Sequence, residues 1–96
     1  MELEITFRNL ESTEAIRTWA AKRFLKVEKH LHDPSSAHLT LSVDRRRHKA
    51  DMTVRAFGDV LHATEETDDM YGAMDGVMAK MEHAVQHRKD KVEHQR

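Results

Sequence analysis

The feature that most constrains the fold is a change of hydrophobic period along the chain. Residues 2–7 alternate between polar and apolar side chains, the period of two that is typical of a strand with one buried face. Over residues 16–31 the apolar positions recur at spacings of three and four, which is one face of a helix. Alternation returns in three later segments, at 39–43, 50–56 and 60–67. Helical spacing returns over 70–85, so the predicted order is β-α-β-β-β-α.

Local signals mark the ends of these elements. Ser12 and Thr13 are candidate N-caps of the first helix. Pro34 should end that helix, because proline disfavours helical backbone in the residue before it. Gly58, with the residue after it, suits a tight turn between the third and fourth strands. The fourth strand is less regular than the others, since Glu65 falls on its apolar side.

Each predicted helix has one apolar stripe, and a stripe of this kind needs a sheet to cover. The first stripe consists of Ile16, Ala20, Phe24, Val27 and Leu31, and the second of Met70, Met74, Val77, Met78, Met81 and Val85. We therefore predict an α+β sandwich, a four-stranded sheet with both helices on one face. The first helix can join two parallel neighbouring strands, whereas the short later connections suit antiparallel hairpins.

Length and composition bound the class of protein. The chain of 96 residues suits a single domain, 1–96. It has no cysteine, which excludes a disulfide framework and a cysteine zinc site. The amino terminus lacks the basic and apolar regions of a signal peptide, and no apolar run approaches the ~20 residues that cross a bilayer. We expect a soluble cytoplasmic protein that has no membrane partner.

Charge is segregated, although the formal net charge is only −1. At ~100° per residue, Lys22, Lys26 and Lys29 fall within roughly 60° of one another on the first helix. An arginine-rich segment, 45–49, lies at a predicted hairpin. The second helix has a basic flank and an acidic flank, formed respectively by Lys80, His83, His87 and Lys91 and by Asp75, Glu82, Gln86 and Glu93. Such a chain can present basic surfaces to a polyanion, or these charges can simply solvate the helices.

Catalytic signatures are missing from the sequence. There is no cysteine nucleophile, no G-x-S-x-G and no glycine-rich phosphate loop, and the chain has only three glycines. His83 and His87 have the i, i+4 spacing that can hold a metal, but no third ligand is evident. We therefore expect no enzyme activity, no cofactor and no metal site.

Two aromatic side chains allow two interpretations. Trp19 and Tyr71 could stack on nucleic-acid bases, as aromatic rings do in RNA recognition. They could instead pack at the margin of the core, which is the more common role of such residues. Both interpretations stay open at the level of the sequence.

Three segments carry a more specific pattern: 42–51 (SVDRRRHKAD), 61–63 (LHA) and 68–75 (DDMYGAMD). Further matches lie in the first helix, at 15–17 and 27–30. Together they resemble the ribosome hibernation promoting factor family, which includes the ribosome-associated inhibitor. The resemblance covers nearly the whole chain.

This resemblance implies a fold related to the double-stranded RNA-binding domain. Similar proteins bind the small ribosomal subunit between head and platform, where they contact 16S rRNA and cover the places of mRNA and tRNA. The resemblance therefore implies a non-enzymatic factor that blocks translation in stress or stationary phase. It also implies a short form that is monomeric when free and that needs a separate ribosome-dimerising factor.

The resemblance also assigns rRNA contacts to basic residues in three places. These are Lys22, Arg23, Lys26 and Lys29 on the first helix, Arg45, Arg47 and Lys49 around the hairpin, and Lys80, Arg88, Lys89 and Lys91 on the second helix, together with His83 and His87 where family members often carry Arg or Lys. Two other functions remain open. One is a general double-stranded-RNA-binding module, and the other is a protein-interaction adaptor that uses the acidic flank.

Overall fold

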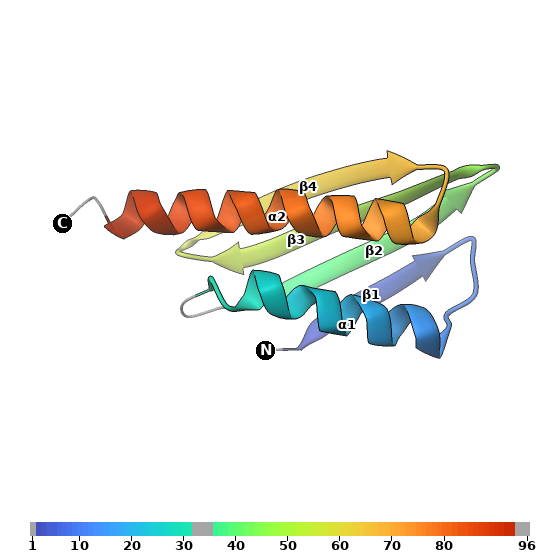
Figure 1. The fold of residues 1–96 in the computed structure, drawn as a ribbon, viewed down its shortest axis with the longest axis horizontal. Helices are drawn as coiled ribbons and strands as arrows, with labels where there is room; N and C mark the ends of the chain where they lie inside the picture. The colour runs from blue at the N-terminus through green and yellow to red at the C-terminus, as the bar shows by residue number, and fades with distance from the viewer. Residues whose placement is uncertain (1, 32–35, 94–96) are drawn as a thin grey trace.

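The computed structural model describes residues 2–31 and 36–93, with side chains to residue 90 (Figure 1). Its elements are β1 (Leu3–Arg8), α1 (Glu14–Glu28), β2 (Ser36–Asp44), β3 (Arg47–Ala56), β4 (Asp59–Thr67) and α2 (Met70–Glu93). The order predicted from the hydrophobic periods is confirmed.

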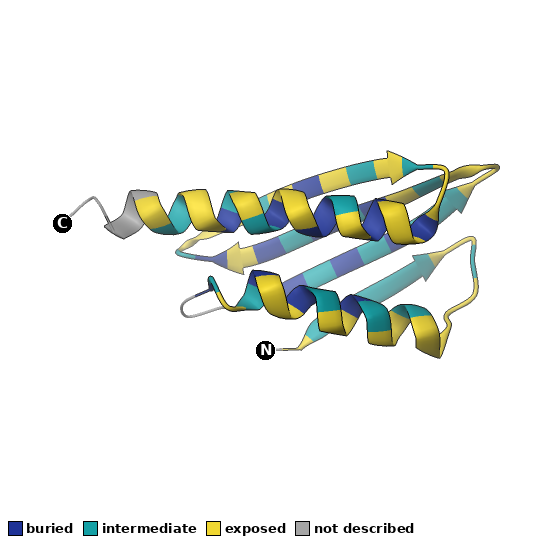
Figure 2. Cartoon of the chain, viewed as in Figure 1, coloured by how far each residue is buried: buried dark blue, intermediate teal, exposed yellow. Residues whose placement is uncertain are grey.

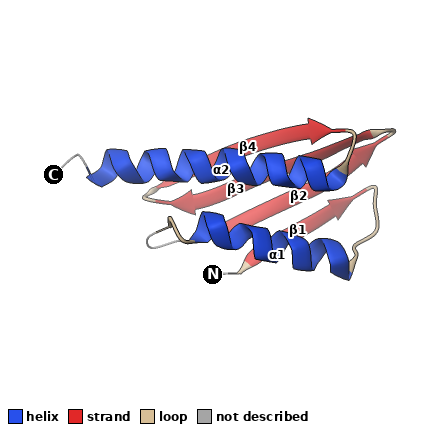
Figure 3. Ribbon diagram, in the orientation of Figure 1, coloured by secondary structure: helices blue, strands red, loops and turns tan. Residues whose placement is uncertain are grey.

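The four strands form one sheet in the order β1-β2-β3-β4. The α1 crossover makes β1 and β2 parallel, whereas the two hairpins make β2–β3 and β3–β4 antiparallel. Both helices lie on the same face of the sheet (Figures 1 and 3). The predicted two-layer α+β architecture is therefore confirmed.

The core lies between the sheet and the two helices (Figure 2). One row of the register runs Ile5, Leu39, Met52 and Ala63 across all four strands, and the last three are buried. The predicted methionine stripe of α2 covers this face, and its members are all buried. The helices therefore sit where the two apolar periods of the sequence require them.

The first helix begins as predicted and ends earlier than predicted. Thr13 has an extended backbone, and its Oγ1 accepts a hydrogen bond from the Ile16 amide at 3.1 Å. α1 ends at Glu28, whose carbonyl accepts a hydrogen bond from the Leu31 amide at 2.9 Å. Leu31 is buried although it lies beyond the helix. The apolar spacing therefore predicted the burial of Leu31 correctly but not its backbone conformation. The predicted stop at Pro34 lies outside the described residues.

The turn between β3 and β4 lies one residue earlier than predicted. β3 ends at Ala56, and Asp59 already belongs to β4. The two residues between them, Phe57 and Gly58, both have positive φ angles, 57° and 70°. Two-residue hairpins favour this mirror-image turn because its twist matches that of the strands.

Glu65 on the apolar side of β4 is accommodated by two residues of α2. Its carboxylate accepts a hydrogen bond from Lys80 Nζ at 3.2 Å, and the same Nζ donates to the Thr64 carbonyl at 2.9 Å. A Cβ on Gly76 would lie 2.5 Å from Glu65 Oε2 and 2.7 Å from its Cγ. Gly76 therefore leaves the space that the Glu65 side chain occupies.

We expect Gly76→Ala to lower the free energy of unfolding, because the new methyl group displaces Glu65 and disturbs its pair with Lys80. In a Glu65→Ala background the same substitution should raise stability by up to about 1 kcal/mol, the helix preference of alanine over glycine. Urea unfolding of all four proteins measures both effects. If Gly76→Ala changes the free energy of unfolding equally in both backgrounds, a side chain at position 76 does not conflict with Glu65.

Candidate nucleic-acid interface

Three lysines of α1 present free charge. Lys22, Lys26 and Lys29 are all exposed, and within the described residues none of their side-chain ammonium groups forms an ion pair or a hydrogen bond. Their shared side of the helix follows from the spacing of four and three residues. Their charge is therefore available to a polyanion.

Arg23, on the same helix, is engaged differently. Its Nε donates to Asp75 Oδ1 at 3.0 Å and its Nη1 donates to Glu82 Oε1 at 3.3 Å, and only 14% of its side chain is exposed. His30 Nε2 lies 4.0 Å from the other oxygen of Glu82. Asp75 and Glu82 of the acidic flank therefore face α1 and join the two helices. The predicted rRNA contact of Arg23 stays a prediction, and any such contact would compete with these carboxylates.

Within the described residues, the hairpin between β2 and β3 carries three cations without an ion-pair partner, Arg45, Arg46 and Lys49, and one paired cation, Arg47. Arg45 and Lys49 are exposed, and within the described residues neither has an ion-pair partner. Arg47 donates through Nε to Glu66 Oε2 at 3.1 Å and through Nη2 to the Glu66 carbonyl at 3.2 Å. Its guanidinium is therefore held against β4, while Arg45 and Lys49 can reach an external anion.

Two of the predicted cations of α2 are also paired. Lys80 is bound to Glu65 on β4, and Arg88 Nη2 lies 3.5 Å from Asp59 Oδ2 at the start of β4. Lys80 and Arg88 therefore face the β4 edge of the sheet. This is the side opposite to the acidic flank.

The remaining predicted residues of α2 differ in exposure. His83 and His87 are exposed, Lys89 is half-buried, and none of the three has a partner in the described part of the chain. The side chain of Lys91 lies outside the described residues. His83 and His87 extend the basic flank toward the carboxyl end of α2. Lys89, nine residues after Lys80, falls on the opposite side of the helix at ~100° per residue.

The basic residues are distributed along the molecule and do not form one patch. Its principal dimensions are 48 × 21 × 17 Å. The β2–β3 hairpin lies at one end of the long axis and the carboxyl end of α2 at the other (Figure 1). On the helical layer, Asp75 and Glu82 lie between the lysines of α1 and the basic flank of α2. Any single ligand that touches all three groups must therefore be large.

The register adds one cation that sequence reasoning did not select. Arg8 of β1 lies opposite Ser42, which lies opposite Lys49 on β3. All three are on the face that the helices leave open, because the neighbouring Leu41 and Ala50 are buried on the other face. Arg8 and Lys49 are thus two strands apart, about 10 Å. Only the parallel pairing of β1 with β2 reveals this proximity.

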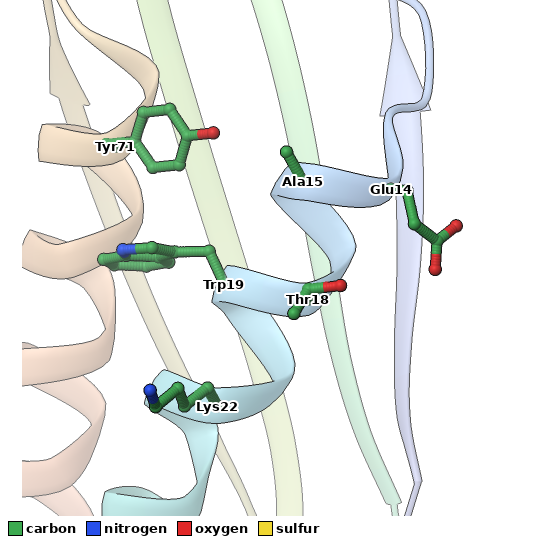
Figure 4. Close-up of a pocket in the computed structure, with 6 residues that line it drawn as sticks. All are labelled: Glu14, Ala15, Thr18, Trp19, Lys22 and Tyr71. Carbon is green, nitrogen blue, oxygen red and sulfur yellow. The ribbon is translucent and has the colours of Figure 1, made fainter.

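The two aromatic side chains lie together on the outer surface of the helical layer (Figure 4). The rings of Trp19 and Tyr71 pack edge to face, with centroids 5.6 Å apart at 72°. Trp19 is half-buried against the core, and Tyr71 is 41% exposed. Packing at the core margin therefore describes Trp19, whereas much of Tyr71 remains open to solvent.

Other kinds of site find little support in the described residues. No group of three or more His, Cys, Asp or Glu side chains among them is placed to hold a metal ion. Over the same residues, no helix is long and apolar enough to cross a membrane. The arrangement favours contacts with a polyanion through dispersed cations.

Comparison with known proteins gives a consistent result. The family model described as "Sigma 54 modulation protein / S30EA ribosomal protein" matches residues 3–93. The ribosome hibernation promoting factor of Escherichia coli is 35% identical over 92 residues, which cover 96% of this chain and 97% of that protein. The protein of the same name from Klebsiella oxytoca is 33% identical with the same coverage.

Solved structures agree with these sequence matches. The Thermus thermophilus Protein Y N-terminal domain has a TM-score of 0.81 at 27% identity, covering 91% of this chain and 98% of that one. A ribosomal subunit interface protein from Coxiella burnetii also has a TM-score of 0.81, covering 94% of this chain and 99% of its own. Its sequence identity is 23%, so this second likeness supports the fold alone.

Proposed function

Because the chain belongs to the family of sigma 54 modulation proteins and S30EA ribosomal proteins, we propose that it is a ribosome hibernation factor. It binds 16S rRNA of the small ribosomal subunit in the decoding channel, blocks the binding of mRNA and tRNA, and inhibits translation in stress or stationary phase. The observation that carries this proposal is the 35% identity, over nearly the full length of both chains, to a protein named for ribosome hibernation.

The geometry supports a mechanism of occlusion without catalysis. The molecule is an elongated wedge, 48 Å long and 21 Å wide, with cations at both ends and along α1. Lysine and arginine supply phosphate contacts that fix position and register but read no sequence. Shape then selects the binding site, and a wedge in the decoding channel excludes mRNA and tRNA by volume. In this proposal the chain acts in the cytoplasm and its partner is the ribosome.

The paired acidic flank favours this function over the protein-interaction adaptor. Asp75 and Glu82 are bound to Arg23, so part of the surface that the adaptor would use already joins α1 to α2. The free cations, in contrast, lie on the outside of the molecule. A polyanion is therefore the partner that the described charges fit best.

We expect the purified chain to sediment with isolated small subunits and to be displaced from them by mRNA together with tRNA. An RNA duplex in about hundredfold excess should leave most of the chain on the subunits, because specific nucleic-acid sites exceed non-specific ones by at least ~10³ in affinity. The measurement is competition in sedimentation at fixed salt. A bovine serum albumin control corrects for trapping in the pellet.

Two outcomes would support the other functions instead. Displacement by duplex RNA at an equal concentration of sites would indicate a general double-stranded-RNA-binding module. Binding to the ribosomal proteins that remain after complete nuclease digestion of the rRNA would indicate a protein adaptor. Either result would contradict occlusion of the decoding channel.

A further inference from the structure

Trp19 borders two hollows, one between α1 and the start of α2 and one on α1 alone. The larger has a volume of about 720 Å³, and Tyr71 and Lys22 lie at its border together with Glu14, Ala15 and Thr18. The smaller, about 320 Å³, is lined by Trp19, Lys22, Arg23 and Lys26. Lys22 belongs to both, so a cation stands beside the indole whichever hollow is filled. The larger one, which we call the aromatic hollow, is drawn in Figure 4.

The aromatic hollow combines flat apolar surface with free positive charge. The ring of Tyr71 extends from α2 toward α1 and lies beside the indole of Trp19, and Lys22 lies on the other side of the indole (Figure 4). Trp19 and Tyr71 pack edge to face with ring centroids 5.6 Å apart, and this contact holds both rings in place before any ligand binds. The carboxylate of Glu14 is directed away from the rings, so it does not oppose an anion there.

A planar aromatic group that carries a phosphate is the ligand that fits this chemistry. Bases pack on aromatic side chains whatever their sequence, because every base has a π-face. Lys22 and Lys26 have no ion-pair partner in the described residues, and both line a hollow with Trp19. A hydrophobic peptide would leave these two cations unpaired, whereas a nucleotide uses both features.

We propose that the aromatic hollow takes one unpaired base of the bound RNA, which packs on Trp19 and Tyr71 while Lys22 and Lys26 hold the adjoining phosphates. This inference rests on the proposed function and adds a contact with a base to the phosphate contacts described above. It makes the helical layer a surface for single-stranded RNA. The contact is tolerant of sequence, because stacking does not depend on the hydrogen-bonding edge of the base.

The chain offers a direct probe, because Trp19 is its only tryptophan. The protein is titrated at low salt with an eight-residue oligoadenylate and, separately, with an abasic oligonucleotide of the same length and charge. We expect the oligoadenylate to quench the emission of Trp19 and the abasic strand to leave it nearly unchanged. Unchanged emission with both, or equal quenching by both, would overturn the proposal.

Variants test the same contact on small subunits. Tyr71→Ala and Trp19→Ala should each weaken binding about 10- to 100-fold, the loss typical of removing one stacking partner. Leu25→Ala is the matched control, since Leu25 is also an exposed apolar residue of α1, at 59%, but does not line the hollow. Tyr71→Phe keeps the ring and should bind like the parent. Thermal unfolding shows whether each variant is folded. If Trp19→Ala is unfolded, Tyr71→Ala alone tests the base contact.

The outcomes separate this inference from the proposed function. If Tyr71→Ala and Leu25→Ala bind small subunits as tightly as the parent, the base contact is absent and occlusion by phosphate contacts stands. If the parent itself does not bind small subunits, the proposed function fails. If Trp19 emission responds to ribosomal proteins stripped of rRNA and not to RNA, the hollow takes a protein and the proposal is overturned.

Discussion

Affinity for the small ribosomal subunit should fall about a thousandfold between ~50 and ~200 mM salt, if about six phosphates are neutralised. The structure supplies the count. Six of the predicted lysines and arginines have no ion pair within the described residues, namely Lys22, Lys26, Lys29, Arg45, Lys49 and Lys89. Each releases a counterion on contact with a phosphate, so log affinity should fall with log salt at a slope of about −5.

Variants assign this slope to particular side chains. Replacement of Lys22, Lys26 and Lys29 by glutamine should reduce its magnitude by about 2.7, which leaves a loss of only about 25-fold over the same salt range. Lys26→Gln alone should reduce it by about 0.9. The matched control is Arg55→Gln, an exposed cation of β3 outside the predicted contacts, which should leave the slope unchanged.

Thermal unfolding tests whether weaker binding by these variants is caused by loss of the folded state. Exposed charges without partners usually affect the free energy of unfolding by less than ~0.5 kcal/mol, so the triple lysine variant should melt like the parent. A flat salt response of the parent would contradict the electrostatic account. An equal change of slope in Arg55→Gln and Lys26→Gln would show that the salt dependence of binding follows the net charge of the protein. It would not then depend on the lysines of α1.

The sequence was sufficient for the architecture because each element carries its own period. Alternation located the strands, and the spacing of three and four located both helices and the faces that they bury. It was insufficient at the ends of elements. Leu31 continued the apolar period of α1 although its backbone is not helical, and the turn at Phe57–Gly58 depends on two positive φ angles that composition does not reveal.

The free and the paired cations could not be separated from the sequence. Arg23 is 52 residues from Asp75 along the chain, and its ion pair exists only because α1 and α2 pack side by side. Lys80 likewise appeared as part of a solvated flank, but the inward carboxylate of Glu65 binds it. Residue types therefore predicted where positive charge lies, and tertiary contacts decide how much of it remains available to RNA.

The second large effect concerns the core. Met74→Ala should lower the free energy of unfolding by about 2–5 kcal/mol, because Met74 is fully buried between α2 and the sheet and its truncation leaves a cavity. A small domain has only about 5–15 kcal/mol of stability, so this loss is a large fraction of the total. Urea unfolding measures it as a lower midpoint with little change in the m-value.

Met74→Leu is the matched control for this prediction. It keeps most of the volume and should cost less than about 1.5 kcal/mol. Met74→Ala should also bind small subunits as tightly as the parent at a temperature where the variant is still folded. The reason is that Met74 has no exposed surface with which to touch RNA. A loss below about 1 kcal/mol would contradict the buried position of Met74. Weakened subunit binding by the folded variant would show instead that packing under α2 positions the cations on its surface.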